Sequence, residues 1–326
     1  MEKKGSKESQ VRAPRNRTIS LTAEEIRCYE SRLGHLQKTA TLHEVVNTTI
    51  CQDALVVLDF LPDHAIDLFF ADPPYNLAKT YNDRPFNRLT CQAYGAWLDS
   101  WIGKLPRILK KTASLYICSD WFSSTTVRCA LEKHFIIRNR ITWEREKGRG
   151  ARSNWKNNSE DIWFATVSND YVFDIDAVKI RRRVLAPYRD GRGRPKDWEE
   201  TPEGPERMTH PSNIWTDLTV PFWSMPENTD HPTQKPEKLL ARIILASSRE
   251  GDIVLDPFLG SGTTSVTARK LGRRYIGVEI DRDYACLAEK RLALAEHNTR
   301  IQGYRDGFFQ ERNAVAHRRG PPRKGD

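Results

Sequence analysis

Residues 66–75 read Ile-Asp-Leu-Phe-Phe-Ala-Asp-Pro-Pro-Tyr, an apolar run that ends in an acid, two prolines and an aromatic residue. The run predicts a buried strand at 66–71. Each proline fixes its own φ at about −65° and restrains the residue before it to extended geometry. The Asp72 carboxylate and the Pro73 carbonyl can then accept the two hydrogens of one amino group, while Tyr75 offers a ring to the attached heterocycle. A rigid turn with a half-buried tyrosine is the competing interpretation, and four residues alone do not decide.

A second motif lies between a strand predicted at 253–256 and a helix predicted at 263–271. The loop between them reads Pro-Phe-Leu-Gly-Ser-Gly. Glycines at such a place let the backbone turn tightly and let a ligand approach closely. Glu279 ends the next predicted strand, 274–279, where a carboxylate can accept from both ribose hydroxyls. The motif therefore predicts a nucleoside-containing cofactor.

Two classes of cofactor fit this loop. No lysine follows Gly262, which excludes a Walker phosphate loop, but NAD and S-adenosylmethionine both stay open. The segment His-Pro-Thr-Gln-Lys-Pro at 231–236 favours the second. Gln234 and Lys235 offer an amide and a cation to an amino-acid carboxylate, and Asp256 can accept from an α-ammonium. NAD has neither group. Taken singly, a surface lysine and a strand-terminal Asp in a turn explain these residues as well.

Composition indicates a folded and basic protein. The 326 residues are 38% hydrophobic and carry a net charge of +9, which is compatible with a polyanionic partner without proving one. The six cysteines form no C-x-x-C pair, so neither a zinc site nor a disulfide framework is indicated, and no metal is expected. No apolar leader and no membrane-length apolar run is found, which predicts a cytoplasmic protein.

Strands alternate with helices along the chain, which is typical of an α/β sheet. Further strands are predicted at 45–50, 113–118 and 135–143, and helices at 22–37, 53–62, 122–133, 236–248 and 281–297. Residues 76–87 form a polar loop, and 91–111 an amphipathic pattern that Pro106 interrupts. Mobile basic tails are expected at 1–18 and 298–326, with the folded part of the chain between them.

The composition shifts after Trp143. Between 145 and 196 Lys and Arg outnumber Asp and Glu, and aromatic residues lie between the basic clusters. This pattern predicts an insert that contacts phosphates and reads bases; a solvated surface lobe is the alternative. Trp143 itself is interpreted either as a second wall beside Tyr75 or as core packing. The residues expected to contact such a nucleic acid are Lys79, Trp143, Arg149, Arg152, Arg181, Arg182, Arg183, Arg189, Arg192 and Arg194.

Together the motifs resemble those of DNA amino-methyltransferases of the circularly permuted β group. Asp72-Pro73-Pro74-Tyr75 is similar to their catalytic motif, 258–263 to their S-adenosylmethionine motif, and 231–236 to the segment before the cofactor loop. The resemblance covers about residues 41–297. It implies a Rossmann-like class I methyltransferase fold with a seven-stranded, mostly parallel sheet and an irregular target-recognition insert. The chain would then divide into a catalytic half at 19–178, a target-recognition region at 179–230 and a cofactor-binding half at 231–297. Catalytic roles would fall to Asp72, Pro73, Pro74 and Tyr75.

The resemblance further implies S-adenosylmethionine as methyl donor and double-stranded DNA as partner, with the target base flipped out. A cognate restriction endonuclease and a homodimer stay open. An acid at the first motif position is associated mainly with adenine N6, so Asp72 favours N6-adenine over N4-cytosine. A nucleotide-dependent oxidoreductase and a catalytically degenerate DNA-binding protein are the remaining alternatives. The residues expected to meet the cofactor are Asp53 (alternatively a helix cap), His231, Gln234, Lys235, Asp256, Phe258, Gly260, Ser261, Gly262, Thr263, Thr264 and Glu279.

Overall fold

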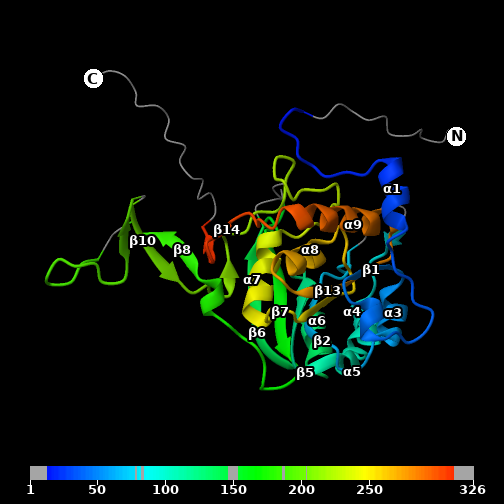
Figure 1. Cartoon of the computed structure of the whole chain (residues 1–326). Coiled ribbons are helices and arrows are strands. Elements are labelled where there is room, and N and C mark those ends of the chain that lie inside the picture. Colours follow the sequence, from blue (N-terminus) through cyan, green and yellow to red (C-terminus); the bar gives the residue numbers. More distant parts are fainter. Residues whose placement is uncertain are drawn as a thin grey trace.

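A central eight-stranded sheet organises the computed structural model, which describes residues 13–77, 79–81, 84–145, 153–185, 188–202 and 204–311 (Figure 1). Neighbouring strands run parallel except where β7 pairs with β5 and β6. The two-residue β11 makes eight strands out of the seven expected. In spatial order the strands are β1 (Thr48–Cys51), β13 (Arg274–Glu279), β12 (Ile253–Asp256), β2 (Ile66–Ala71), β5 (Leu109–Ser119), β7 (Ser159–Thr166), β6 (Ile136–Glu144) and β11 (Ile214–Trp215).

Helices cover both faces of this sheet. Successive side chains of a strand point to opposite faces, so Phe69 and Phe70 of β2 enter two separate apolar cores, and both are buried. The core around Phe69 is closed by α3 (Ala54–Phe60), α4 (Cys91–Ile102), α5 (Leu105–Ile108) and α6 (Ser124–Leu131). The core around Phe70 is closed by α7 (Glu237–Ser247), α8 (Thr263–Lys270) and α9 (Arg282–His297). This layering confirms the predicted α/β fold class.

A five-stranded second sheet projects from the side of the molecule (Figure 1). Its order is β14 (Tyr304–Arg305), β15 (Phe308–Gln310), β8 (Ile180–Arg183), β10 (Gly204–Thr209) and β9 (Glu199–Thr201). The expected irregular insert thus contains strands. The expectation of a mobile tail from residue 298 is wrong for 304–310, because Phe309 is fully buried beside Ile180 and Ile301. The apolar residues of this segment are too sparse to form a periodic pattern, so its strands could not be predicted from the sequence.

Most predicted elements are confirmed, and the differences have local causes. The helix predicted at 22–37 has its Thr22–Glu25 capping box but ends earlier, as α1 (Ala23–Glu30). The strand predicted at 45–50 begins only at Thr48, because α2 (Leu42–Val45) and the positive φ of Asn47 precede it. The polar loop holds a hairpin of β3 (Lys79–Tyr81) and β4 (Arg84–Phe86), η1 (Asp176–Val178) is a short 3₁₀ turn, and β7 was not predicted.

The first described residues are tied to the body of the protein rather than forming a tail up to residue 18. The backbone N–H of Arg17 donates to Trp223 at 2.7 Å, and that of Ile19 donates to Asn228 at 2.8 Å. Among the described helices, none is both long enough and apolar enough to cross a membrane. No cluster of three or more His, Cys, Asp or Glu suited to a metal occurs in the described ranges.

Candidate active site

The acidic residues of both motifs lie at one edge of the central sheet. β2, β12 and β13 are adjacent and parallel, so their carboxyl ends bring Asp72, Asp256 and Glu279 to the same edge. Ligand sites of open α/β sheets form at this edge. β7 runs in the opposite direction, and its first residues, including Glu160, therefore reach the same edge.

The Asp72 carboxylate is held by two side chains. Its Oδ1 accepts from the Tyr75 hydroxyl at 2.9 Å, and its Oδ2 accepts from Lys235 Nζ in an ion pair. Burial and the charge of Asp72 raise the pKa of Tyr75 well above its ordinary value, so the phenol stays protonated and donates. From α4, Tyr94 donates to the Pro74 carbonyl at 3.0 Å and fixes the second proline. Side-chain hydrogen bonds from Tyr75, Lys235 and Tyr94 therefore hold the Asp-Pro-Pro-Tyr motif in place.

Lys235 lies deeper in the site than the sequence indicated. Its side chain is 7% exposed, and Nζ lies 3.3 Å from Glu160 Oε2 and 3.4 Å from the Tyr75 hydroxyl. Burial alone would lower the pKa of Lys235, but Asp72 and Glu160 outweigh it and hold the pKa above its ordinary value. The sequence predicts that this ammonium meets a cofactor carboxylate. In the structure it faces the carboxylate of the Asp-Pro-Pro-Tyr motif.

Glu160 is a site residue that the sequence did not reveal. Its side chain is 4% exposed, and its Oε1 accepts from Arg145 at 2.5 Å. Glu160 lies in β7, and Arg145 directly follows β6, the antiparallel neighbour of β7; of these two strands only β6 was predicted. The continuous apolar run 162–165 shortly after Glu160 is the signal that could have placed it at the start of a strand. The result is a network of four charges in which Lys235 and Glu160 are buried and Asp72 and Arg145 are partly exposed.

The glycine loop is held by the carboxylate of Glu279, which ends β13. Gly260 and Gly262 have φ of 57° and 87°, which favour glycine. Glu279 accepts from the N–H groups of Gly260 at 2.7 Å and Asp281 at 2.8 Å. Burial raises the pKa of Glu279 to about 7. The loop is therefore fastened to the end of β13.

Asp256 is fastened in the same way. Its Oδ1 accepts from the N–H of Phe258 at 2.9 Å, and its Oδ2 from the Thr264 hydroxyl at 2.5 Å. Burial raises the pKa of Asp256 to about 7, against the lowering effect of these two hydrogen bonds. A buried carboxylate at this place suits a cationic group of a ligand.

A buried arginine supports the loop from behind. Arg291 of α9 donates to the Ser261 carbonyl at 2.9 Å, the Thr263 hydroxyl at 2.9 Å and Glu237 at 3.0 Å. Ser261 and Thr263 were both expected to contact a cofactor; in the structure, the Ser261 carbonyl and the Thr263 hydroxyl accept hydrogen bonds from Arg291. Neither Arg291 nor Glu237 was predicted, because nothing in their local sequence distinguishes them from surface helix residues. Lys270 completes the cluster at 2.7 Å from Glu237.

The remaining predicted cofactor residues differ in placement. The His231 ring packs against Tyr284 with ring centroids 4.4 Å apart, next to Gly260. Gln234 is turned inward: its amide accepts from Thr229 N–H at 2.8 Å and donates to the Glu227 carbonyl at 2.7 Å. This amide stabilises the turn before α7, so the expected contact with a cofactor carboxylate is not supported.

Two further cofactor candidates lie elsewhere along the edge. Asp53 caps α3 by accepting from Leu55 N–H at 2.8 Å, which is the alternative role considered for it. The Phe258 ring contacts Trp97 and Trp101, with centroids 6.0 and 5.4 Å apart. Its packing joins the glycine loop to α4.

Trp143 is a core residue. It is 1% exposed, and its indole N–H donates to the Leu218 carbonyl at 3.2 Å. The expectation that it walls the base site or contacts DNA is corrected, because a buried indole packed beneath 218–220 presents no accessible face. Arg149 and Arg152 lie outside the described residues, and so does the side chain of Lys79.

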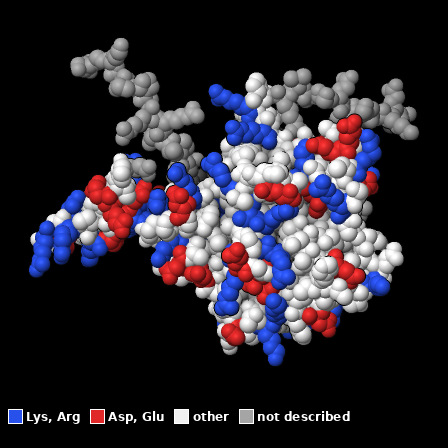
Figure 2. All heavy atoms as spheres, in the orientation of Figure 1, with Lys and Arg blue, Asp and Glu red and all other residues white. Residues whose placement is uncertain are grey.

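The remaining basic candidates lie on the projecting sheet and its hairpin, where Asp and Glu are interspersed with Lys and Arg (Figure 2). Arg181 lies 3.6 Å from Glu206 and Arg182 lies 3.9 Å from Glu311. Further acidic neighbours are Glu200 for Arg189 at 3.8 Å and Asp190 for Arg194 at 2.9 Å, while Arg183 and Arg192 are exposed. Acidic residues thus lie beside most of these arginines, so the surface of the projecting sheet is less uniformly basic than the sequence predicted.

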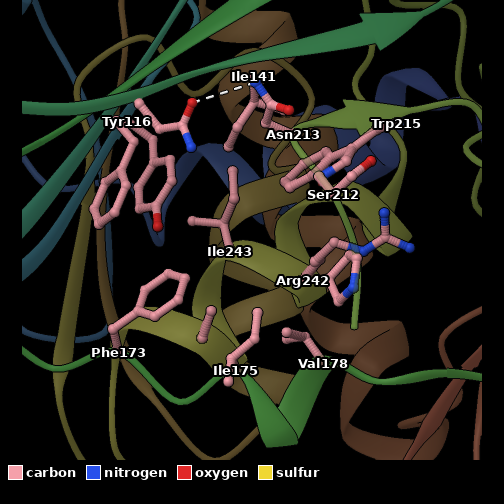
Figure 3. A pocket seen from close by; sticks show the side chains of 14 residues that line it. Tyr116, Ile141, Phe173, Ile175, Val178, Ser212, Asn213, Trp215, Arg242 and Ile243 are labelled. Carbon is pink, nitrogen blue, oxygen red and sulfur yellow. Dashed lines mark hydrogen bonds between the residues drawn. The ribbon is translucent and has the colours of Figure 1, made fainter. Parts of the chain in front are cut away.

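A cavity of about 260 Å³ lies on the α7 side of the sheet, away from these residues (Figure 3). Aromatic and aliphatic side chains line it, among them Tyr116, Trp215 and Ile243. None of the residues predicted to act in catalysis or cofactor binding borders it. We assign it no part in the site.

Comparison with known proteins agrees with this arrangement. A family model described as DNA methylase, for N6 and N4 methyltransferases, matches residues 66–290. The chain is 35% identical over 277 residues to the DNA adenine methyltransferase YhdJ of Escherichia coli, covering 83% of this chain and 87% of that protein. It is 32% identical to the Type II methyltransferase M.HpaI of Haemophilus parainfluenzae, covering 74% and 73% of the two chains.

Solved structures share the fold. A complex of M1.HpyAVI with SAM superposes with a TM-score of 0.52 at 22% identity, covering 75% of this chain and 98% of that one. The cytosine-N4-specific PvuII DNA methyltransferase gives a TM-score of 0.56 at 16% identity, covering 80% and 93%. With the family match spanning both motifs, these findings establish that the chain belongs to the N6/N4 DNA methylase family.

Proposed function

We propose that this protein transfers a methyl group from S-adenosylmethionine to the N6 amino group of an adenine flipped out of double-stranded DNA. The observation that carries the proposal is the adjacency of β2 and β12, which brings Asp72 and the glycine loop to one edge of the sheet. A methyl donor on the loop and an amine on Asp72 would meet there. An oxidoreductase would leave the braced Asp-Pro-Pro-Tyr motif without a role.

The residues at the loop fit S-adenosylmethionine. The buried Asp256, with its raised pKa, suits an α-ammonium group, and Glu279 keeps lone pairs that could accept from ribose hydroxyls. The positive φ of Gly260 and Gly262 keeps the loop compact where a ligand would approach. When bound, S-adenosylmethionine supplies an electrophilic methyl group on a sulfonium. Lys235 is not included among the residues proposed to bind S-adenosylmethionine, because its ammonium is paired with Asp72.

The chain's own residues would prepare the amine for attack. The lone pair of an adenine amino group is delocalised into the ring, which makes it a poor nucleophile. By accepting both N–H groups, Asp72 and the Pro73 carbonyl would favour a pyramidal nitrogen and aim its lone pair outward. Positioning and preorganised charge then supply most of the acceleration. The proton leaves after the nitrogen has become cationic, so no strong base is needed.

Flipping a base out of the duplex costs a few kcal/mol, which contacts in the site must offset. Stacking on an aromatic ring contributes about 1–3 kcal/mol. Tyr75 is the candidate ring, since its hydroxyl is fixed on Asp72. Trp143 is not, because it is buried in the core.

Adenine is the preferred target for two reasons. An acid stands at the first motif position, and a relative with 35% identity is named a DNA adenine methyltransferase. The N4-cytosine alternative has the same hydrogen-bonding needs. We further propose that the projecting sheet, with 179–230 and the added strands β14 and β15, recognises the target sequence. In this organisation 19–178 and 231–297 form the catalytic and cofactor-binding halves.

The test is expression in a host without DNA methylation, followed by mapping of modified bases by single-molecule sequencing. N6-methyladenine at one defined sequence is expected; N4-methylcytosine would change the target, and unmodified DNA would refute the proposal. Asp72→Ala should abolish the modification while calorimetric affinity for S-adenosylmethionine stays within about threefold, because Asp72 acts only on the amine. Modification by Asp72→Ala at the level of the unaltered protein would remove Asp72 from the mechanism.

A further inference from the structure

The ammonium of Lys235 occupies the acceptor that an incoming amine would need. Under the proposed function, Asp72 accepts an N–H of the target amino group. Its Oδ1 already accepts from Tyr75 at 2.9 Å, and its Oδ2 already accepts from Lys235 Nζ. An ammonium N–H is a stronger donor than a neutral amine. Each Asp72 oxygen keeps a second lone pair, so a target amine can still reach it, but at Oδ2 the amine would share one oxygen with a charged ammonium that is the stronger donor.

A second acceptor for Lys235 lies beside the first. Glu160 Oε2 is 3.3 Å from Nζ and has no hydrogen-bond partner among the described residues, whereas Oε1 is held by Arg145. A buried carboxylate oxygen without a hydrogen bond is costly. A short movement of the flexible lysine stem toward Glu160 would complete that missing hydrogen bond.

We propose that Lys235 is a placeholder for the target amine, bound to Asp72 while the base site is empty and transferred to Glu160 when the amine enters. The proposal rests on the proposed role of Asp72. Lys235 and Glu160 are positioning residues in this scheme, since they act through Asp72 and not on the reacting atoms. Arg145 keeps Glu160 in place to receive the ammonium.

Charge explains both positions. In the empty site a largely desolvated Asp72 without a cation would be unfavourable, and Lys235 neutralises it; the Asp72 side chain is 17% exposed. During methyl transfer the target nitrogen becomes cationic, and an ammonium still on Asp72 would repel it across a few ångströms. With Lys235 on Glu160, the Asp72 charge faces the new cation alone. Two carboxylates and two cations make up the network, so the transfer leaves its net charge unchanged.

Three variants test the transfer: Glu160→Gln, Lys235→Met, and the two combined. The target sequence is taken from the mapping experiment, and 2-aminopurine is placed next to the target adenine in an oligonucleotide duplex, so that the target keeps its amino group and its flipping is read from the unstacked neighbour. Glu160→Gln should hold Lys235 on Asp72, lowering kcat by about tenfold or more and suppressing the fluorescence rise that accompanies flipping. Lys235→Met should retain the fluorescence rise, because Asp72 is left accessible.

The combined variant is the decisive one. It removes the placeholder and its second acceptor together, so that the network keeps one carboxylate, Asp72, and one cation, Arg145. It should therefore recover most of the fluorescence rise and about tenfold in kcat relative to Glu160→Gln alone. Two independent structural lesions would instead make the combined variant worse than either single one. A combined variant no better than Glu160→Gln overturns the proposal.

Two controls keep failures apart. Affinity for S-adenosylmethionine should stay within about threefold in all three variants, since none is placed in the cofactor set. If Glu160→Gln does not fold, Glu160→Asp, which keeps the charge but withdraws the oxygen, should give a smaller loss of kcat that Lys235→Met again relieves; no relief refutes the placeholder. The unaltered protein and Asp72→Ala are measured alongside. Equal activity of the unaltered protein and Asp72→Ala would count against the proposed function. If Asp72→Ala is inactive but the combined variant recovers no activity relative to Glu160→Gln, only the placeholder role of Lys235 is refuted.

Discussion

Gly262 approaches Ala288 of α9 so closely that a β-carbon on residue 262 would lie 2.6 Å from the Ala288 Cβ. Gly262 also has a φ of 87°, a backbone conformation that residues with a side chain rarely adopt. Gly262→Ala therefore combines backbone strain with a clash between the first turn of α8 and α9. We expect a loss of about 3 kcal/mol in the free energy of unfolding and at least about tenfold weaker binding of S-adenosylmethionine. Thermal unfolding and calorimetry measure the two effects.

The chain offers a matched control for this substitution. Gly307 has a φ of 81°, but nothing lies within 4 Å of where its β-carbon would stand. Gly307→Ala should cost about 1 kcal/mol from strain alone and leave cofactor affinity unchanged. Equal losses in both variants would mean that the contact with Ala288 contributes nothing.

Binding of S-adenosylmethionine should strengthen as the pH rises from about 6 to 8. The raised pKa values of Asp256 and Glu279, both about 7, leave these carboxyls partly protonated at pH 6.5. A ligand ammonium favours ionised Asp256, so binding should release protons. Calorimetry at pH 6.5 in phosphate and in imidazole buffers, whose ionisation enthalpies differ, should give heats that differ accordingly. Asp256→Asn should weaken binding and flatten its pH dependence; an unaltered pH profile in this variant would assign the titration elsewhere.

The same two carboxyls make the unliganded protein less stable as the pH rises. A raised native pKa means that the folded state binds more protons than the unfolded state between the unfolded pKa, near 4, and the native pKa of about 7. Their contribution to the free energy of unfolding therefore falls through that window. Urea unfolding at pH 5.5 and 7.5 should show that Asp256→Asn reduces this fall. A fall of unchanged size would contradict the assignment.

Trp143→Phe should alter stability and not DNA binding. The substitution removes the hydrogen bond from the buried indole to the Leu218 carbonyl and leaves part of the core unfilled. A loss of about 1–2 kcal/mol is expected. Trp155→Phe is the control, because Trp155 is 93% exposed and should leave the free energy of unfolding within about 0.5 kcal/mol. A DNA affinity that falls in Trp143→Phe without loss of stability would restore Trp143 to the base site.

The sequence predicted those elements whose local pattern is strong. The strands at 66–71, 253–256 and 274–279 are confirmed at their bounds, since each is a short apolar run followed by a motif at the edge of the sheet. Asp281 likewise caps α9 as predicted. What escaped prediction depends on contacts between distant segments. β15 is a strand because Phe309 finds a buried place beside β8, which no local pattern specifies.

The site shows the same division. Asp72, Tyr75, Asp256 and Glu279 stand at strand ends, where a motif can be recognised from sequence alone. The partner of Lys235 could not be recognised, because an ammonium on a long side chain selects its carboxylate by tertiary position. Glu160 reaches it only because β7 runs antiparallel to its neighbours. A prediction of that one reversed strand would have placed Glu160 at the catalytic edge.

Neutralising Arg181, Arg182 and Arg183 together should weaken DNA binding and flatten its dependence on salt. For every arginine that binds a phosphate, its replacement should lower the slope of log K against log salt by roughly 1. Glu206 and Glu311 lie near Arg181 and Arg182, so the full change of about 3 is an upper limit. Fluorescence anisotropy of a labelled duplex across a salt series measures it. Lys111→Gln, an exposed residue near the start of β5 and far from the strand ends that carry Asp72, provides the control. A slope that the triple replacement leaves unchanged would make the cluster a solvated surface and direct the search for phosphate contacts to the hairpin that carries Arg189, Arg192 and Arg194.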